Sequence, residues 1–282
     1  MNDWKKYLEK PTRVKLYAIH TGYVHMNGNI HFNKKSPRFK SMPVDKRFTP
    51  VFAYIVEHPQ AGFTLLDTGL HSSFADNPSG NFGWLLGKIV KTRVESGSDV
   101  LSQLKKIDIS PDNISRIILS HLHLDHVSGL PLFHNTDVTV FVDTSELRVA
   151  MSPFSQMKGC INAHIKGFKT VPIQYPISIP PFDQVWDFFD DGSLFIIGTP
   201  GHSPGHISVL LNTIGGLNLL TFDASHRKAN IEELIPPGGD YAHALTSLKN
   251  IRAFLSAFPE TQVIFGHDPD QQSLKLVPEY YS

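Results

Sequence analysis

Short apolar runs bounded by glycine, proline and polar turn residues recur along the chain and predict β-strands. In the first half these runs are RVKLYAI (13–19), FAYIVEH (52–58), GFTLLDTG (62–69), RIILS (116–120) and VTVFV (138–142). In the second half they are SLFIIG (193–198), HISVLL (206–211), LNLLTFD (217–223) and TQVIFG (261–266). The segments PQAG (59–62) and NTIGG (212–216) each join two such runs and predict hairpin turns.

Helical segments alternate with these strands in both halves. We expect helices over 98–106, from Asp143 through DTSELRVAM, and from Asp240 to Pro259, where Asp240 is a suitable N-cap. Residues 70–96 mix Gly, Ser, Asn and aromatics and predict a long loop with some helix, serving as a lid or pocket wall. Residues 152–182 are proline-bearing and irregular.

The chain is long enough, at 282 residues, for one large α/β domain or two ordinary ones. It carries no fixed-period repeat, no low-complexity segment and no linker-like stretch. We therefore expect a single α/β domain over residues 1–282.

Composition narrows the class of protein. Twenty-six basic residues balance 26 acidic ones, which argues against nucleic acid as the main partner. The single cysteine, Cys160, allows no internal disulfide and fits a reducing compartment. No signal peptide is evident and no apolar run reaches the roughly 18 residues that a membrane span needs. These features predict a cytoplasmic protein with no membrane attachment.

The segment SHLHLDHVSG, directly behind the apolar run Ile117–Leu119, concentrates metal-binding side chains. His121, His123 and Asp125 alternate, so in an extended segment they point the same way, and His126 opens the next turn or helix. Four ligands at this spacing suit two ions about 3.5–4 Å apart better than one tetrahedral ion. Imidazole with carboxylate and no thiolate suits zinc, cobalt, manganese or iron. The alternative is a solvated His-rich loop.

Three further strands end in residues that can bind a metal: His202, Asp223 and His267. A single histidine after a strand is usually a polar loop residue. Three such endings together with the first motif predict one site, because α/β proteins assemble their sites in loops at one edge of a sheet.

The motifs HLHLDH, TPGHSPGH, TFDASH and FGHD, in this order and spacing, resemble the metallo-β-lactamase superfamily, and most of all its N-acyl-homoserine lactonase branch. The likeness runs from TLLDTG to FGHDPDQ. It implies an αββα sandwich of two mixed sheets flanked by helices. It also implies two divalent ions, most often Zn²⁺, of which one is bound by His121, His123 and His202, the other by Asp125, His126 and His267, with Asp223 bridging both.

The resemblance also implies roles around the ligands. Asp67 matches a position that supports a ligand histidine, although an aspartate before Thr-Gly also suits a turn. His206, the second histidine of GHSPGH, is expected to pack or hydrogen-bond rather than bind metal. His20, His58, His71, His134 and His164 are expected to be ordinary surface or loop residues.

The implied reaction is hydrolysis of the lactone ring of N-acyl-homoserine lactones by a hydroxide bridging the two ions. No GxSxG motif is present, and Asp125 is the expected proton shuttle. The lactonases commonly have a tyrosine three residues after the bridging aspartate, where this chain has His226. Its imidazole either replaces that hydroxyl as a hydrogen-bond donor or is a loop residue turned away.

Apolar residues near the motifs are candidates for a wall around an acyl chain. Leu124 lies between two ligands and faces the mouth of the site or the core beneath it, while Met26, Phe82 and Trp84 either line the pocket or pack elsewhere. A homodimer is a further expectation from the relatives.

Other functions fit the same motifs less well. A hydrolase of another lactone, a thioester or an organophosphate would use the same ligands. A di-iron redox protein commonly has a carboxylate at the place of His123, an RNA-processing nuclease needs basic stretches, and a structural metal module needs a closed ligand shell.

Overall fold

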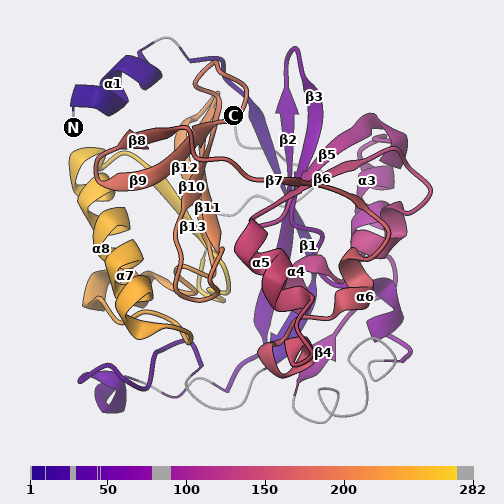
Figure 1. Ribbon diagram of the computed structural model, residues 1–282. Helices are drawn as coiled ribbons and strands as arrows, with labels where there is room; N and C mark the ends of the chain where they lie inside the picture. The colour runs from indigo at the N-terminus through magenta and orange to yellow at the C-terminus, as the bar shows by residue number, and fades with distance from the viewer. Residues whose placement is uncertain are drawn as a thin grey trace.

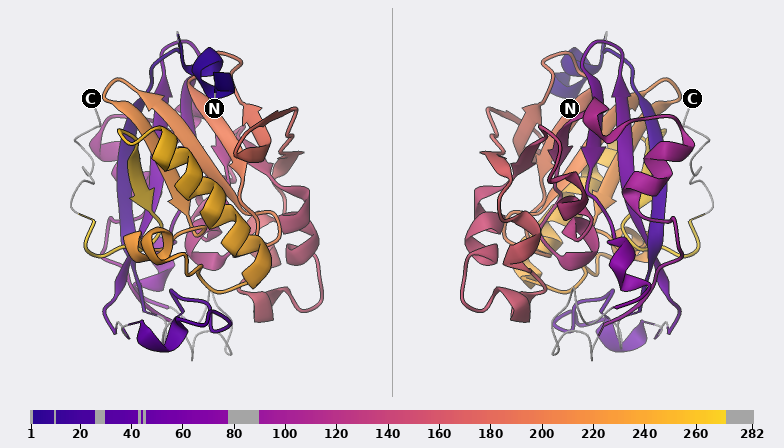
Figure 2. Two further views of the ribbon diagram at one scale, coloured as in Figure 1. Left: turned by 90° about the vertical axis from the view of Figure 1, so that its left-hand side faces the viewer. Right: turned by 90° about the vertical axis from the view of Figure 1, so that its right-hand side faces the viewer.

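Two β-sheets lie face to face in the middle of the molecule, and helices cover their outer faces (Figure 1). The computed structural model describes residues 2–9, 11–25, 30–42, 44, 46–77 and 90–271. Figure 2 shows α8 lying across one sheet in its left view, and helices of the first half covering the other sheet in its right view. This is the αββα arrangement of two mixed sheets that the sequence predicted.

The first sheet has seven strands in the order β4-β1-β2-β3-β5-β6-β7. Pairing is antiparallel from β4 to β3 and parallel from β3 to β7, so the sheet is mixed. The strands are β1 Lys15–His25, β2 Thr49–His58, β3 Gly62–Leu66, β4 Lys91–Arg93, β5 Ile114–Ile118, β6 Thr139–Val142 and β7 Lys169–Pro172.

The second sheet has six strands in the order β13-β12-β11-β10-β9-β8 and is also mixed, because only the β12–β13 pair is parallel. The predicted hairpin turn between β11 and β12 is present, with Thr213 opposite Gly216. The strands are β8 Ile177–Ile179, β9 Phe182–Asp187, β10 Leu194–Gly198, β11 Ile207–Thr213, β12 Gly216–Phe222 and β13 Gln262–Phe265.

Helices begin where aspartates cap them. The carboxylates of Asp99, Asp143 and Asp240 accept backbone N–H groups in the first turns of α3, α5 and α8. The helices are α1 Asn2–Leu8, α3 Val100–Lys106, α4 Leu124–Val127, α5 Thr144–Ala150, α6 Asn162–Ile165, α7 Lys228–Glu233 and α8 Tyr241–Ala257. Short 3₁₀ turns are η1 Phe39–Ser41, η2 Ser72–Phe74, η3 Pro111–Asn113, η4 Leu130–Phe133 and η5 Ser155–Lys158.

Alternating side chains of the central strands build three apolar layers. In β10, Leu194 and Ile196 point between the sheets, while Phe195 and Ile197 point toward α8. Strands buried on both faces are apolar at successive positions, which explains why the runs in the sequence are continuous rather than alternating. On the outer face of the second sheet, Trp4 of α1 contacts Phe195 edge to face, with ring centroids 5.3 Å apart.

Several elements were not predicted. Residues 152–182 contain η5, α6, β7 and β8 rather than irregular chain alone, and α1, β4 and β9 were also missed. Within 70–96 the structure has η2 and β4, while Met26, Phe82 and Trp84 lie outside the described residues. The extent of one domain over residues 1–282 stays a prediction. In the described part of the chain, every helix is too short or too polar to cross a bilayer.

Candidate metal centre

The first motif follows the central strand β5. After Ile118 the chain bends at Ser120 and reaches His123, the extended N-cap of the short helix α4, with φ −70° and ψ 150°. Asp125 and His126 therefore lie in the first turn of this helix. The expectation that Asp125 continues the extended segment was wrong, because the chain turns at Leu124. Because of this turn, Asp125 and His126 approach the site from a different direction than His121 and His123.

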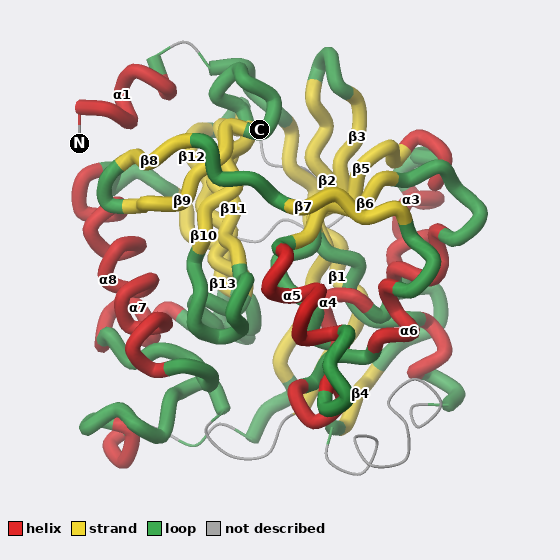
Figure 3. Tube along the Cα trace, in the orientation of Figure 1, coloured by secondary structure: helices red, strands yellow, loops and turns green. Residues whose placement is uncertain are grey.

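Imidazoles from several segments surround the carboxylate of Asp223, which follows β12. Its Oδ1 lies 3.3 Å from His126 Nε2 and 3.2 Å from His267 Nε2. Its Oδ2 lies 3.2 Å from His202 Nε2 and 3.8 Å from His121 Nε2. The two oxygens of one carboxylate thus face two different groups of imidazoles. Figure 3 traces in green the loops that follow β10, β12 and β13. These loops carry His202, Asp223 and His267, whereas His126 lies in α4 after the loop that follows β5.

The remaining two predicted residues complete the two groups. His123 Nδ1 lies 2.9 Å from His202 Nε2, and Asp125 Oδ2 lies 3.4 Å from His267 Nε2. The structure therefore brings all seven predicted residues together. Three groups have ligand-type atoms within 4.8 Å of one another: His121, His123, His202 and Asp223; Asp125, His126 and His267; and Asp223, His226 and His267.

Hydrogen bonds on the outer side of the imidazoles direct their other nitrogens inward. His267 Nδ1 lies 2.9 Å from the carbonyl oxygen of Pro50, which can only accept, so Nδ1 carries a proton and Nε2 is the nitrogen that faces the cluster. Among the described residues, His121 Nε2, His126 Nε2 and His267 Nε2 are buried and have no hydrogen-bond partner. Buried ring nitrogens left without partners are costly. Their convergence fits a site for cations.

Asp67 supports His126 from outside the cluster. Its Oδ2 accepts from His126 Nδ1 at 2.7 Å and from the hydroxyl of Ser120 at 2.7 Å, and its Oδ1 accepts the backbone N–H of Ser120 at 2.7 Å. Its φ of +54° also places it in a tight turn. Both explanations offered for this aspartate are therefore correct, since a turn residue presents its carboxylate to a histidine of the site.

His206 holds the backbone of Asp223. Its Nε2 accepts the Asp223 N–H at 3.0 Å, so its Nδ1 carries the proton and donates to Thr199 Oγ1 at 3.0 Å. Both ring nitrogens are therefore engaged outside the cluster. Burial lowers the pKa of His206 to about 3, which keeps the ring neutral. The prediction that His206 hydrogen-bonds rather than joins the metal-binding group is consistent with these contacts.

Glu146 is a residue that the sequence reasoning missed. It lies in α5 and is fully buried. Its Oε2 accepts the N–H of Leu122 at 3.0 Å, and its Oε1 accepts the N–H of Gly205 at 2.8 Å. One carboxylate thus ties the loop of the first motif to the loop of GHSPGH. The sequence at the start of α5 contains no motif that would predict a glutamate joining two loops.

His226 lies inside the cluster rather than turned away. It is 1% exposed, and its Nε2 lies 3.1 Å from Asp223 Oδ2. Its Nδ1 lies 3.1 Å from Nδ1 of His31, a second residue that sequence reasoning missed. Burial, together with the nearby His226, lowers the pKa of His31 to about 2. Two buried neutral imidazoles therefore meet edge to edge beside Asp223.

Charges within the cluster offset one another. Burial and the neighbouring imidazoles lower the pKa of His121 well below its ordinary value. For His126 burial acts in the same direction, but the carboxylates of Asp223, Asp125 and Asp67 raise its pKa well above that value. Burial tends to raise the pKa of Asp223, yet the surrounding histidines lower it well below the usual range. The cluster therefore favours an ionised carboxylate at its centre.

Two cavities meet at this cluster. A cavity of about 210 Å³ lies over it and is lined by Ile30, Val90, Leu124 and Gly159 together with four residues of the cluster and His226. A second cavity, of about 720 Å³, adjoins His123 and His202 and shares Lys158 with the first. Leu124 also packs on Phe74, so it faces both the mouth of the site and the core.

The remaining histidines divide into two kinds. His134 is exposed, as expected. The expectation that His58 and His164 are surface or loop residues was wrong, because both are buried. His58 Nε2 lies 2.8 Å from Asp191 Oδ2, and burial lowers the pKa of His164 to about 4. The thiol of Cys160 is buried as well, and burial raises its pKa to about 12.

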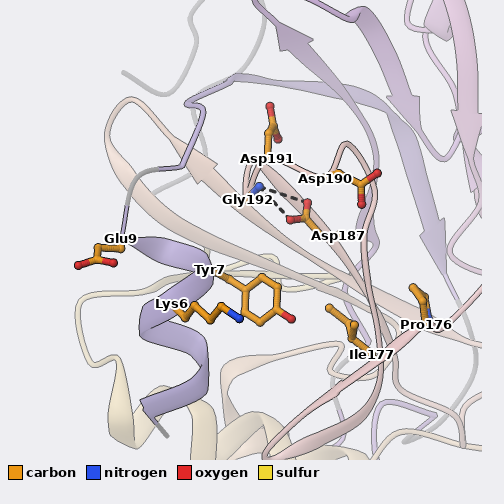
Figure 4. Close-up of a pocket in the computed structure, with 9 residues that line it drawn as sticks. All are labelled: Lys6, Tyr7, Glu9, Pro176, Ile177, Asp187, Asp190, Asp191 and Gly192. Carbon is orange, nitrogen blue, oxygen red and sulfur yellow. Dashed lines mark hydrogen bonds between the residues drawn. The ribbon is translucent and has the colours of Figure 1, made fainter.

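A hollow of about 640 Å³ lies at the opposite end of β10, between α1 and the turn before that strand (Figure 4). Its carboxylates stabilise the turn. Both oxygens of Asp187 accept the N–H of Gly192, at 3.2 and 3.0 Å, and Asp191 accepts the N–H of Ser193 at 3.1 Å. Burial raises the pKa of Asp187 to about 6.

The sequence of residues 47–267 matches the metallo-beta-lactamase superfamily, to which the chain belongs. The N-acyl homoserine lactonase AiiA of Bacillus thuringiensis subsp. kurstaki is 32% identical over 234 residues, which cover 82% of this chain and 86% of that protein. The N-acyl homoserine lactonase AttM of Agrobacterium fabrum is 29% identical over 277 residues, covering 96% of this chain and 100% of that protein.

A solved structure gives the same likeness in three dimensions. It is an N-acyl homoserine lactone hydrolase with the product N-hexanoyl-L-homoserine bound at the catalytic metal centre. It is 29% identical, covers 96% of this chain and 99% of that one, and superposes with a TM-score of 0.75. The predicted superfamily and its lactonase relatives are thus confirmed.

Proposed function

We propose that this protein is a dimetal hydrolase that opens the ring of N-acyl-homoserine lactones. The observation that carries the proposal is the bridging position of Asp223, whose two oxygens face two separate groups of inward-directed imidazoles. The product complex of the relative described above supports the same substrate class. Imidazole and carboxylate donors without thiolate make Zn²⁺ the proposed metal.

Each ion would be held by residues that follow strands of both sheets. His121, His123 and His202 with Asp223 Oδ2 are the proposed ligands of one ion, and Asp125, His126 and His267 with Asp223 Oδ1 are those of the other. When bound, two such ions supply a shared water whose pKa falls from 15.7 to about 7, and a polarised carbonyl.

The protein's own residues handle the proton and the carbonyl. The Asp125 carboxylate lines the cavity over the site, where it can take a proton from the attacking water. It then returns that proton to the ring oxygen as the bond between this oxygen and the acyl carbon breaks. His226 lines the same cavity, and an N–H of its ring can donate a hydrogen bond to the substrate carbonyl oxygen. Ile30, Val90 and Leu124 exclude water from this step.

Lactone turnover on a defined preparation tests the proposal. The zinc-loaded protein would be incubated with acyl-homoserine lactones of several chain lengths, and acid release would be followed. A thioester and a phosphotriester would serve as competing substrate classes. We expect turnover of the lactones to exceed that of the other classes by orders of magnitude and to be abolished by Asp223→Ala. Failure to open any lactone with two ions bound would refute the proposal.

A further inference from the structure

We infer that Lys158 is a specificity-determining residue, whose ammonium donates a hydrogen bond to the amide carbonyl oxygen of an N-acyl-homoserine lactone. The inference rests on the proposed function and extends it from the lactone ring to the acyl amide beside that ring. It starts from the two cavities at the cluster, which have three lining residues in common. Two of these, His123 and His202, are proposed metal ligands, and the third is Lys158.

A substrate with an acyl chain extends across the boundary between the two cavities. The cavity over the cluster holds about 210 Å³, which is less than the roughly 300–1,000 Å³ of ordinary ligand pockets. With the lactone ring at the metals, the acyl chain continues into the cavity of about 720 Å³, where Val149, Pro200 and Pro204 offer apolar contact. The amide joins the ring to the chain, so it lies at the boundary of the cavities, where Lys158 stands.

The backbone of Lys158 is fixed against the first motif. Lys158 ends η5, and Gly159 follows in the left-handed conformation with φ +77°. The carbonyl oxygen of Gly159 accepts the N–H of Leu124 at 3.1 Å. Cys160 then pairs with His123 as an isolated antiparallel bridge. The flexible side chain of Lys158 therefore starts from a fixed point next to a proposed metal ligand.

The chemistry of the ammonium selects the amide oxygen. Among the described residues that line either cavity, Lys158 is the one lysine or arginine. Its side chain is exposed, and no carboxylate of the described chain forms an ion pair with it. An ammonium has three N–H groups and no acceptor, so it pairs with a carbonyl oxygen and not with the amide N–H. The lactone carbonyl is engaged at the cluster in the proposed reaction, which leaves the amide carbonyl to Lys158.

Two kinds of lactone separate this role from a general one. Zinc-loaded wild-type and Lys158→Met protein would be assayed on N-hexanoyl-homoserine lactone and on a γ-alkyl lactone of similar length, which lacks the amide. We expect the substitution to lower kcat/KM about 10-fold for the first substrate, mainly through KM, because a charged donor is lost away from the reacting bond. Turnover of the γ-alkyl lactone should stay within about twofold. Lys158→Arg keeps a cationic donor and should retain most of the preference for the acyl-homoserine lactone.

Lys166→Met is the matched control, because it makes the same change of charge at an exposed lysine that lines neither cavity. Its kcat/KM on both substrates should equal that of the wild type, and zinc stoichiometry should stay at two in every variant. A Lys158→Met protein that keeps its full kcat/KM on the acyl-homoserine lactone would overturn the inference. So would one that loses as much on the γ-alkyl lactone.

Calorimetric binding of the two ring-opened products to zinc-loaded protein gives a reading that needs no turnover. Lys158→Met should weaken the binding of N-hexanoyl-L-homoserine about 10-fold. It should leave unchanged the binding of the hydroxy acid from the γ-alkyl lactone, which has the carboxylate but no amide. Equal effects on the two products, or no effect on either, would overturn the inference. If the wild type opens no lactone, the proposed function fails, and this binding comparison still tests Lys158.

Discussion

Asp67→Asn is the substitution that best tests how the cluster prepares its nitrogens for metal. The wild-type carboxylate accepts three hydrogen bonds, each at 2.7 Å, from the backbone and hydroxyl of Ser120 and from His126 Nδ1. In the asparagine variant the amide oxygen can keep the backbone N–H of Ser120. The amide NH₂ then stands where Oδ2 was and faces two groups that donate in the wild type.

The two groups respond differently to the new NH₂. The hydroxyl of Ser120 can rotate and accept. The His126 ring can accept only by moving its proton from Nδ1 to Nε2, the nitrogen that lies 3.3 Å from Asp223 Oδ1. A protonated Nε2 cannot bind a metal. Loss of such a supporting partner typically costs 10–100-fold in metal affinity, which corresponds to about 1.4–2.8 kcal/mol.

Zinc competition against a chromophoric chelator measures this effect, with elemental analysis for stoichiometry. We expect the Asp67→Asn variant to hold one of two ions more weakly, namely the ion assigned to Asp125, His126 and His267. Ser120→Ala is the comparison variant, because it removes a hydroxyl from Asp67 but leaves the carboxylate facing His126. It also removes the contact of Ser120 Oγ with His121 Nδ1 at 3.1 Å, so any loss of affinity should fall on the ion assigned to His121, His123 and His202. Its affinity for the ion assigned to Asp125, His126 and His267 should remain within a few fold of the wild type. Two ions bound by Asp67→Asn as tightly as by the wild type would refute the reasoning.

Three further predictions follow from the described contacts. Glu146→Gln replaces one carboxylate oxygen by an NH₂ that faces a backbone N–H, so the free energy of unfolding measured in urea should fall by about 1–3 kcal/mol. An unchanged urea midpoint would contradict this prediction. Chelation of the metal should lower the melting temperature, and added zinc should restore it, because ions that bind only the folded state stabilise it. Burial lowers the pKa of His164 to about 4 in the folded protein. Its contribution to the free energy of unfolding is therefore present above pH 6.5 and is lost as the pH falls toward 4. In metal-free protein, His164→Phe should therefore make the acid limb of the stability profile shallower, by about 3 kcal/mol at most.

Much of the fold could be predicted because most central strands are buried on both faces and are apolar at successive positions. Leu194 to Ile197 of β10 are an example. The strand β9 was missed because FDQVWD has buried residues at irregular spacing, with Asp183 and Gln184 exposed together. The three-residue strands β4 and β8 form too few contacts to leave any pattern. Whether such a short segment forms a strand depends on the strand with which it pairs, and the local sequence does not predict that partner.

The candidate site could be predicted as far as its residues follow strands. His121, His202, Asp223 and His267 each stand just beyond an apolar run, so sheet geometry brings them to one edge. His31 gave no such signal, because it meets His226 across 195 positions and does not stand directly after an apolar run in the sequence. Its place depends on hydrogen bonds between its segment and residues 230–238, one of them from the side-chain amide of Asn230, and no spacing in the sequence predicts such bonds.

The partition of the cluster has a mechanical consequence. His121 and His126 follow a strand of the first sheet, whereas His202 and His267 follow strands of the second. With the ligands assigned as we propose, each ion would join the two sheets at one edge, in addition to the apolar contact between them and hydrogen bonds such as that from Val14 N to Asn212 O. The proposed ions would therefore stabilise the contact between the two sheets as well as supply chemistry. On heating, metal-free protein should lose the packing between its sheets before either sheet unfolds.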